Sequence, residues 1–187
     1  MTQRAMERLN METMLRRAID RDEFVLHYQP RVDLETNRIV GAEALIRWHH
    51  PERGLLHPHD FIGLAEEAKL IIPLGEWVLQ AVCAQQAQWR AAGVPPLQVA
   101  VNLAASHLRE PGLPGLVTHN LVQYGLPADS LGIEVTESVL LSDPEESIKN
   151  ATTLARWGVA LSLDDFGIGY SSLSYLKRLP VSQIKID

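Results

Sequence analysis

The sequence predicts an α/β fold in which strands and helices alternate around a sheet, as they do in a β/α barrel. Three observations predict it. From residue 97 onward, strand-like and helix-like segments follow one another in the order β-α-β-α-β-α-β, and crossovers of this length join parallel strands. The strand-like runs are almost uniformly apolar, as expected when both faces of a sheet are covered. Several of these runs also end in a polar or acidic residue, at the edge where a barrel carries its active site.

The N-terminal part is expected to contain a helix and two paired strands. Residues 1–22 are rich in charge, and their apolar side chains lie near helical spacing, which predicts an exposed lead-in helix. Residues 24–34 read as a strand, and Pro30 restricts this strand to an edge or an end of the sheet. A turn at 35–37 leads to a second strand at 39–48, and so short a connection predicts antiparallel pairing.

The next segment is expected to change from loop to helix. Residues 49–59 are rich in Pro, Gly and His and predict a solvated loop. His59 or Asp60 can cap a helix that runs to Ala68. A longer amphipathic helix is expected at 73–91.

The remaining elements alternate in type. Strands are expected at 97–104, 131–137, 159–165 and 181–187, and helices at 113–124, 144–158 and 171–179. The helix that begins near residue 144 has the clearest start, because Asp143 can cap it, Pro144 suits its first position and Glu146 can complete a capping box.

Length and charge narrow the class of protein. The 187 residues suffice for one domain with a single core. The net charge of -6 argues against a general DNA- or RNA-binding surface. Cys83 is the only cysteine, which fits a reducing cytoplasm. The longest apolar stretch, 70–82, is too short and too polar to cross a membrane.

Polar residues in or after successive strand-like runs form the main functional signal. These residues are Glu43, Asn102, Glu134, Asp164, Asp165 and Lys185. Strand ends that converge on one acidic cluster suggest a metal site, and oxygen donors without a Cys or His set favour a hard divalent cation.

Each of these residues also has a structural explanation when it is taken alone. Glu43 can form a buried ion pair with Arg47, and Asn102 can be a hydrogen-bonding residue at a strand end. The adjacent Asp164 and Asp165 can belong to a turn or a helix cap. Lys185 can extend to the surface.

The ordered motifs resemble the EAL domain, the cyclic di-GMP phosphodiesterase domain of bacterial signalling proteins. The matching motifs, in order, are Tyr28-Gln29-Pro30, Glu43-Ala44-Leu45, Ala44-Leu45-Ile46-Arg47-Trp48, Glu134-Val135-Thr136-Glu137-Ser138, Asp164-Asp165-Phe166-Gly167-Ile168-Gly169-Tyr170-Ser171-Ser172-Leu173 and Lys185-Ile186-Asp187. The resemblance extends from about Leu9 to Asp187. We therefore expect a lead-in helix at 1–22 and an EAL domain at 23–187.

The resemblance implies a TIM-like β/α barrel with one antiparallel strand. It also implies hydrolysis of cyclic di-GMP to linear pGpG with a pair of Mg²⁺ or Mn²⁺ ions. By motif, the ligands of one metal are resembled by Glu43, Asn102, Glu134 and Asp164, and a ligand of a second metal by Asp165. Lys185 resembles the lysine beside the attacking water, and Glu137 resembles the anchor of the loop after Asp165. The residues that resemble the substrate pocket are Gln29, Leu45 and Arg47. Glu43, Asp165 and Lys185 are thus the expected catalytic group.

Two departures from the family pattern keep an alternative open. Ile168 stands where the family usually has Thr, in a loop linked to metal binding and dimer coupling. The match also stops before the last two β/α units of the family barrel, so we expect a fragment or a C-terminally truncated copy. The alternatives to an enzyme are a non-catalytic cyclic di-GMP-binding module and an inactive fragment. The resemblance further implies a homodimer, an upstream GGDEF or sensory domain, and a cytoplasmic location in a parent protein that other domains can attach to a membrane.

Overall fold

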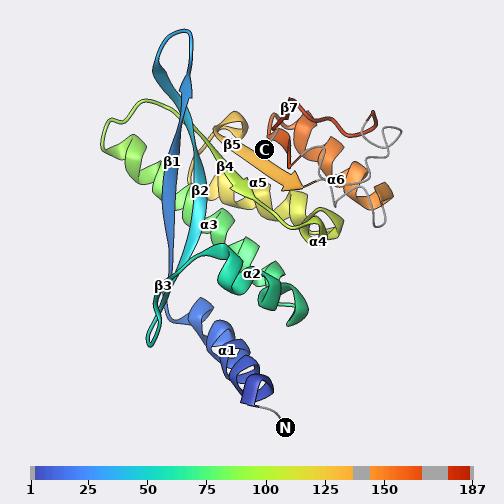
Figure 1. Ribbon diagram of the computed structural model, residues 1–187. Coiled ribbons are helices and arrows are strands. Elements are labelled where there is room, and N and C mark those ends of the chain that lie inside the picture. The colour runs from blue at the N-terminus through green and yellow to red at the C-terminus, as the bar shows by residue number, and fades with distance from the viewer. Residues whose placement is uncertain (1–2, 137–143, 166–176, 186–187) are drawn as a thin grey trace.

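The computed structural model describes residues 3–136, 144–165 and 177–185 of the chain (Figure 1). The helices, in chain order, are α1 (Gln3–Asp20), α2 (Pro58–Glu67), α3 (Ile71–Ala91), α4 (Ala105–Arg109), α5 (Leu113–Gln123), the 3₁₀ turn η1 (Ala128–Ser130) and α6 (Pro144–Arg156). The strands are β1 (Phe24–Asp33), β2 (Arg38–His50), β3 (Gly54–Leu56), β4 (Gln98–Asn102), β5 (Leu131–Thr136), β6 (Ala160–Asp164) and β7 (Gln183–Ile184). The expected helix at 171–179 and the glycines after Asp165 lie mostly outside the described residues.

The strands form one sheet in the order β1-β2-β4-β5-β6-β7, with the short β3 beside β2. Strand β1 pairs antiparallel with β2, and the pairs β2–β4, β4–β5, β5–β6 and β6–β7 are parallel. This confirms the predicted α/β fold, with the parallel strands of a β/α barrel and one antiparallel strand. Within the described residues the sheet stays open, with β1 and β7 at its two ends.

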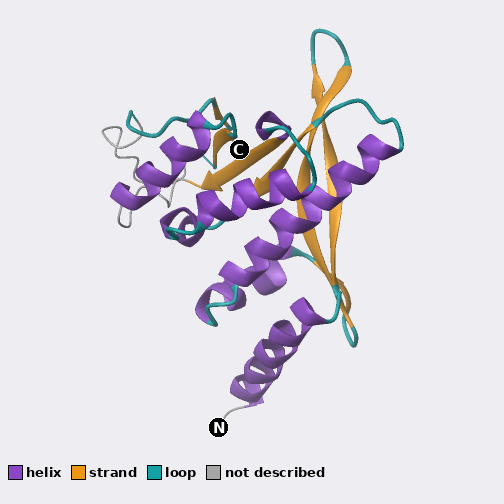
Figure 2. Cartoon of the chain, turned by 180° about the vertical axis from the view of Figure 1, so that it is seen from behind, coloured by secondary structure: helices purple, strands orange, loops and turns teal. Residues whose placement is uncertain are grey.

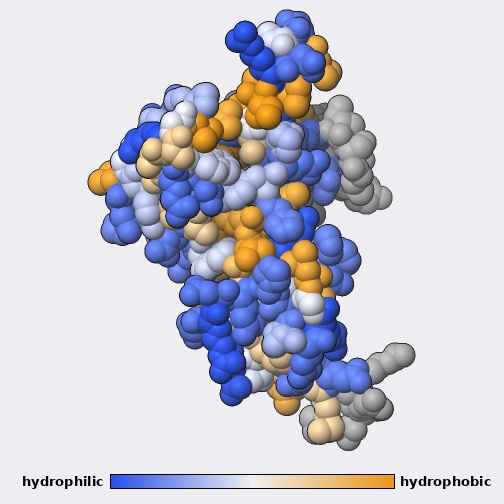
Figure 3. Space-filling view, turned by 90° about the vertical axis from the view of Figure 1, so that its left-hand side faces the viewer, coloured by the Kyte–Doolittle hydropathy of each residue, from blue (hydrophilic) through white to orange (hydrophobic). Residues whose placement is uncertain are grey.

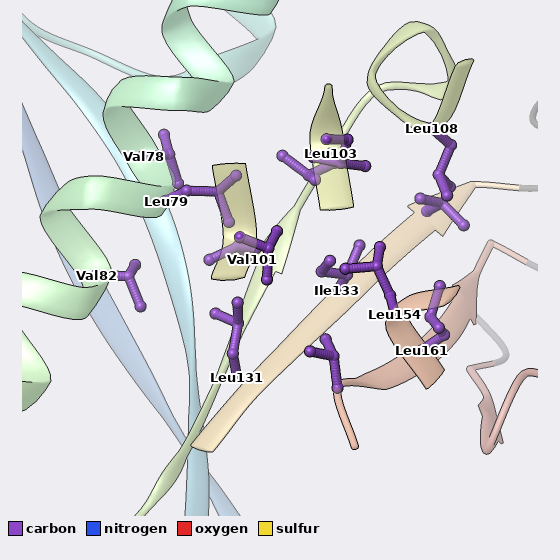
Figure 4. Close-up of a cluster of buried hydrophobic side chains, with 14 of the residues drawn as sticks. Val78, Leu79, Val82, Val101, Leu103, Leu108, Leu131, Ile133, Leu154 and Leu161 are labelled. Carbon is purple, nitrogen blue, oxygen red and sulfur yellow. The ribbon is translucent and has the colours of Figure 1, made fainter. Parts of the chain in front are cut away.

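Helices cover the outer face of the sheet, and the main core lies between them. Figure 2 shows α3 and α5 packed across this face when the molecule is seen from behind. In Figure 4, Val78, Leu79 and Val82 of α3 point toward Val101 and Leu131 on the strands. These parallel strands are apolar along their length because the packed layer buries them.

A second core joins α1 to the base of the β1–β2 hairpin. Leu15 of α1 is fully buried against an aromatic group, in which the rings of Phe24 and Trp48, and those of Trp48 and Phe61, have centroids 5.8 Å apart. The expectation of an exposed lead-in helix was therefore wrong for this face. Leu9 is 57 % exposed. This apolar side chain, which the helical spacing identified, therefore does not help to dock α1.

The segment expected as a solvated loop is partly ordered by backbone pairing. Strand β3 folds back onto the end of β2, with His50 opposite Gly54, whose φ of +73° makes the turn. His50 is 3 % exposed, and its Nδ1 accepts hydrogen bonds from the backbone N–H groups of Glu52 and Arg53. Only part of the histidine-rich segment is therefore solvated.

Two helix starts differ from the sequence-based expectation, and one short helix was not expected. Helix α2 is capped at His57, whose backbone N–H donates to Asp60 Oδ2 over 2.9 Å, and neither His59 nor Asp60 is the cap residue. Helix α3 begins at Ile71, because Pro73 lies in the first turn, where backbone N–H groups need no helical acceptor. The short helix α4 was not predicted, since five residues give no readable periodicity.

The tip of the β1–β2 hairpin carries exposed apolar side chains. Figure 3 shows apolar atoms near this projecting end of the molecule, and the exposed residues of the hairpin include Val32, Leu34, Ile39 and Val40. The tip lies away from the carboxyl ends of the parallel strands. None of the helices in the described ranges has the length and apolar character needed to cross a bilayer.

Candidate active site

Five of the predicted site residues meet at the carboxyl ends of the parallel strands. Asn102 Nδ2 donates to Glu43 Oε1 over 2.6 Å, which joins β4 to β2. Lys185 Nζ lies 3.1 Å from Glu43 Oε2 and 3.8 Å from Asp164 Oδ2, and it also donates to Glu134 Oε2. The structure thus brings together three carboxylates, one amide and one ammonium from segments up to 142 residues apart.

The register of the sheet explains this convergence. Asn102 ends β4 directly beside Glu134 of β5, and Glu43 of β2 lies beside Ala100 of β4. Asp164 ends β6 beside Thr136. Neighbouring parallel strands point their carboxyl ends the same way, so residues at those ends share one edge of the sheet.

The ammonium of Lys185 lies within 3.8 Å of carboxylate oxygens of Glu43, Glu134 and Asp164. Its backbone N–H donates to the carbonyl of Leu163 over 2.8 Å, which extends the β6–β7 pairing by one residue and fixes the start of the side chain. Burial lowers the pKa of the ammonium, but hydrogen bonds to Glu134 and Glu43 outweigh burial and raise the pKa overall. The lysine is therefore a permanent cation here, and the option that it extends to the surface does not hold.

Glu134 is the most enclosed acid of the group. Its side chain is fully buried, and burial raises the pKa of its carboxyl, while the hydrogen bond from Lys185 lowers it and the charges of Glu43 and Asp164 raise it. Among the described residues, its Oε1 has no hydrogen-bond partner. A buried carboxylate of this kind requires nearby cations.

Asp165 is not part of the observed cluster. Asp165 is exposed, with a φ of +54°, and its backbone N–H donates to Asp164 Oδ1 over 3.0 Å. The turn after β6 thus begins at Asp165 itself, and within the described residues no ion pair or hydrogen bond joins its carboxylate to the other acids. Glu137 and Ile168 lie outside the described residues.

The three expected pocket residues lie on the β1–β2 hairpin. Gln29 is directly opposite Glu43 in the β1–β2 register, so both side chains are on one face. Arg47 Nη1 donates to the carbonyl of Ile46 over 2.8 Å, whereas its buried Nε has no hydrogen-bond partner among the described residues. Glu43 pairs with Lys185, which replaces the ion pair with Arg47 that the sequence left open.

A cavity of about 860 Å³ opens beside the cluster. Leu45, Asn102 and Glu134 line its inner side, and apolar residues of α2 and α3 line the other side. Charged side chains at the rim include Glu66, Lys69 and Arg109. The volume and the mixed lining suit a ligand of nucleotide size.

The donor set fits a hard divalent cation in chemical terms. Three carboxylates and an amide converge, and Glu134 has a buried oxygen without a hydrogen bond. However, within the described ranges no group of three or more His, Cys, Asp or Glu side chains is arranged to hold a metal ion. The ammonium of Lys185 lies among the carboxylates in this structure.

Sequence reasoning missed two contributors to the site. Arg31 Nη1 lies 3.6 Å from Glu134 Oε1, and Gln98 Oε1 accepts a hydrogen bond from Arg31 Nη2 over 3.0 Å. Arg31 follows Gln29 by two residues on the same strand, a period that places both side chains on one face. The two-residue spacing from Gln29 was the sequence signal that could have identified Arg31.

The amino-acid sequence is similar to those of one known domain family. The sequence profile of the family described as "EAL domain" matches residues 12–187. The chain is 44 % identical over 187 residues to the "Bifunctional diguanylate cyclase/cyclic di-GMP phosphodiesterase MucR" of Pseudomonas aeruginosa, covering all of this chain and 27 % of that protein. It is 46 % identical over 184 residues to the "Cyclic di-GMP phosphodiesterase NbdA" of the same organism, covering 98 % of this chain and 24 % of that protein. The chain thus spans about a quarter of the length of these relatives.

Solved structures show the same fold. The PaMucR phosphodiesterase in complex with c-di-GMP superimposes with a TM-score of 0.88 at 44 % identity, over 95 % of this chain and 72 % of that chain. The EAL enzyme Bd1971, in its cAMP- and cyclic-di-GMP-bound form, superimposes with a TM-score of 0.87 at 30 % identity, over the whole of this chain and 51 % of that one.

Proposed function

The chain belongs to the EAL domain family, and on that premise we propose that it is a metal-dependent phosphodiesterase domain that hydrolyses cyclic di-GMP to linear pGpG. The observation that carries the proposal is the cluster of Glu43, Glu134, Asp164, Asn102 and Lys185 beside the 860 Å³ cavity. The names of MucR and NbdA, and the c-di-GMP complex of PaMucR phosphodiesterase, support the substrate.

The proposed metal ligands are the oxygen donors at the strand ends. Glu43, Asn102, Glu134 and Asp164 would hold one Mg²⁺ or Mn²⁺, and Asp165 would serve a second ion. Divalent cations in such sites lower the pKa of a bound water and stabilise the charge on a phosphodiester. The family as a whole implies a divalent metal, and the choice between Mg²⁺ and Mn²⁺ is part of the proposal.

The remaining residues bind and orient the substrate. The Nε of Arg47, which has no hydrogen-bond partner among the described residues, can donate to a phosphate oxygen. Leu45 lines the cavity, and Gln29 would complete the pocket from strand β1. In the reaction, the oxygen of water forms a bond to phosphorus, one phosphorus–ribose oxygen bond breaks, and the leaving oxygen takes up a proton. Lys185 would orient the water and stabilise negative charge beside it. Glu137 would anchor the loop after Asp165.

The domain is proposed to act within a larger protein. MucR and NbdA are about four times as long as this chain, and MucR is named as bifunctional. We infer an upstream GGDEF or sensory domain, a homodimer as the working form and a cytoplasmic location. The unpaired, buried Cys83 fits a reducing compartment.

A direct assay tests the proposal. The purified protein is incubated with cyclic di-GMP and Mg²⁺ or Mn²⁺, and pGpG is followed by chromatography, with EDTA as a control. We expect metal-dependent product, no product from Glu43→Gln, and weaker substrate binding with retained metal binding in Arg47→Ala. Turnover that persists in EDTA, or in folded Glu43→Gln, contradicts the proposed site.

One observation favours a binding module that does not hydrolyse its ligand. Lys185 occupies the space among the three carboxylates, and within the described ranges no metal-binding arrangement is present. Calorimetry distinguishes the two functions: a module binds cyclic di-GMP in EDTA and releases it unchanged after metal is added. An inactive fragment binds neither ligand nor metal.

A further inference from the structure

Arg31 reaches from the edge strand β1 toward the most enclosed acid of the site. Its Nη1 lies 3.6 Å from Glu134 Oε1, the oxygen that has no hydrogen-bond partner among the described residues. The arginine side chain is 24 % exposed, and that of Glu134 is fully buried. Since Lys185 bonds to Oε2, the two oxygens of Glu134 face different cations.

A glycine on the intervening strand leaves space for this contact. Arg31, Gly41 and Gln98 lie side by side in one row across β1, β2 and β4. A Cβ on Gly41 would lie 2.7 Å from the carbonyl oxygen of Gln98, 3.0 Å from Arg31 Nη2 and 3.2 Å from Arg31 Nε, closer than side chains normally pack. The guanidinium therefore lies over β2 at the one residue that has no side chain.

The opposite end of the guanidinium is fixed by hydrogen bonds. Arg31 Nη2 donates to Gln98 Oε1 over 3.0 Å, and Gln98 Nε2 donates to the carbonyl of Asp129 over 3.1 Å. The planar fork can make both contacts at once, which a lysine ammonium on its flexible stem does not reproduce. The orientation of Arg31 is thus set by β4 and the turn that precedes β5.

We propose that Arg31 is a positioning residue for the metal site: it holds Glu134 by Oε1, so that Oε2 stays directed at the place among Glu43, Glu134 and Asp164 where Lys185 Nζ lies. This inference rests on the proposed function, because it assumes that Glu134 is a metal ligand. Partners that fix the orientation of a metal-binding carboxylate commonly contribute ten- to hundredfold to metal affinity or activity. Arg31 would do so from its place beside Gly41 and Gln98, toward the amino ends of β2 and β4, without touching the substrate.

The test measures Mn²⁺ affinity by electron paramagnetic resonance of the free ion, together with hydrolysis kinetics. Arg31→Met removes the charge and the fork, Arg31→Lys keeps only the charge, and Arg38→Met changes an exposed arginine on the same hairpin. We expect Mn²⁺ affinity to fall about ten- to hundredfold in Arg31→Met and less in Arg31→Lys, with Arg38→Met unchanged. The KM for cyclic di-GMP should change little at saturating metal.

A purely structural role gives a different result. Melting temperature would then fall in Arg31→Met, while Mn²⁺ affinity of the folded protein would match the wild type, and the inference would be overturned. If Arg31→Met does not fold, wild-type affinity in Arg31→Lys overturns it instead. A wild-type protein that binds no Mn²⁺ and makes no pGpG rejects the proposed function and this inference together, whereas an active wild type with unaffected variants rejects the inference alone.

Discussion

At the scale of single residues, one ammonium lies among the carboxylates of three strands. Lys185 and Glu43 keep about a fifth of their side chains exposed, at 21 % and 20 %, and Glu134 keeps none. Removing one partner of a buried ion pair costs roughly 3–5 kcal/mol because the other charge remains buried. The cost is smaller here to the extent that solvent reaches Lys185, and a bound cation would offset it further.

Replacing Lys185 with Met should lower both the melting temperature and kcat, for two different reasons. Without metal, the three carboxylates repel one another, so the melting temperature should fall by several degrees and recover when Mn²⁺ is added. At saturating metal, kcat should fall much more than KM rises if the lysine acts on the chemical step, as proposed. Lys149→Met is the matched control, because Lys149 pairs with Glu146 in solvent and such pairs contribute little. A larger effect on KM than on kcat would make Lys185 a binding residue.

At the scale of elements, the contact between α3 and α4 positions one wall of the cavity. His107 of α4 is 3 % exposed and rests on Gly75 of α3, where an added Cβ would lie 2.0 Å from His107 Nε2. The two helices can approach this closely only because Gly75 has no side chain. Helix α4 also carries Ser106 and Arg109, which line the cavity.

Gly75→Ala should therefore destabilise the protein although alanine favours helices. We expect a loss of about 1–3 kcal/mol from overpacking, measured by urea unfolding. Gly63→Ala is the control, since Gly63 also lies within a helix but nothing is within 4 Å of its added Cβ. That variant should gain up to about 1 kcal/mol. Equal effects in the two variants would show that α3 and α4 adjust without cost.

The same histidine makes stability depend on pH. Burial lowers the pKa of His107, and hydrogen bonds to backbone carbonyls and the charge of Glu110 only partly oppose it. Below pH about 6.5 the unfolded chain binds a proton that the folded chain does not, so stability falls as pH decreases through this range.

His107→Gln should remove this contribution. Between pH 7.5 and 5.5, the variant should lose up to about 1 kcal/mol less unfolding free energy than the wild type, as measured by denaturant titration at both values. His49→Gln, which changes an exposed histidine, should keep the wild-type dependence. Parallel pH profiles for His107→Gln and the wild type would exclude His107 as the source.

At the scale of the whole molecule, two cores are connected through β2. The upper part of this strand carries Glu43 and Leu45 at the site, and its end places Trp48 in the aromatic core that also holds α1. The N-terminal helix is thus packed as part of the fold, although it is rich in charged residues.

Leu15→Ala should show how much α1 contributes. A fully buried leucine replaced by alanine typically costs about 2–5 kcal/mol, so thermal unfolding should shift clearly and remain a single transition. Leu9→Ala, at a residue that is 57 % exposed, should change stability by less than about 0.5 kcal/mol. A wild-type melting curve for Leu15→Ala would mean that α1 does not stabilise the domain.

Strands and their order were largely predictable, because buried parallel strands read as short apolar runs between helix-like segments. The convergence of Glu43, Asn102, Glu134, Asp164 and Lys185 was also predictable, since each residue lies in or directly after such a run. Short or irregular features were not: α4 and β3 are too short for periodicity to identify them. The contact between Arg31 and Glu134 depends on the Gly41 gap and on tertiary packing, which local sequence does not encode.

The separation of Glu43 and Lys185 by 142 residues has a consequence during protein synthesis. At about 5–20 residues per second, translation adds Lys185 roughly 7–28 s after Glu43. The ribosome-bound chain therefore passes through lengths at which β4 and β5 exist but Lys185 does not. In that interval Arg31, whose Nη1 lies 3.6 Å from Glu134 Oε1, is the cation beside Glu134, because Lys185 has not yet been added. Lys185, which directly follows strand β7, thus brings a second cation to Glu134 after Arg31 has already been synthesised.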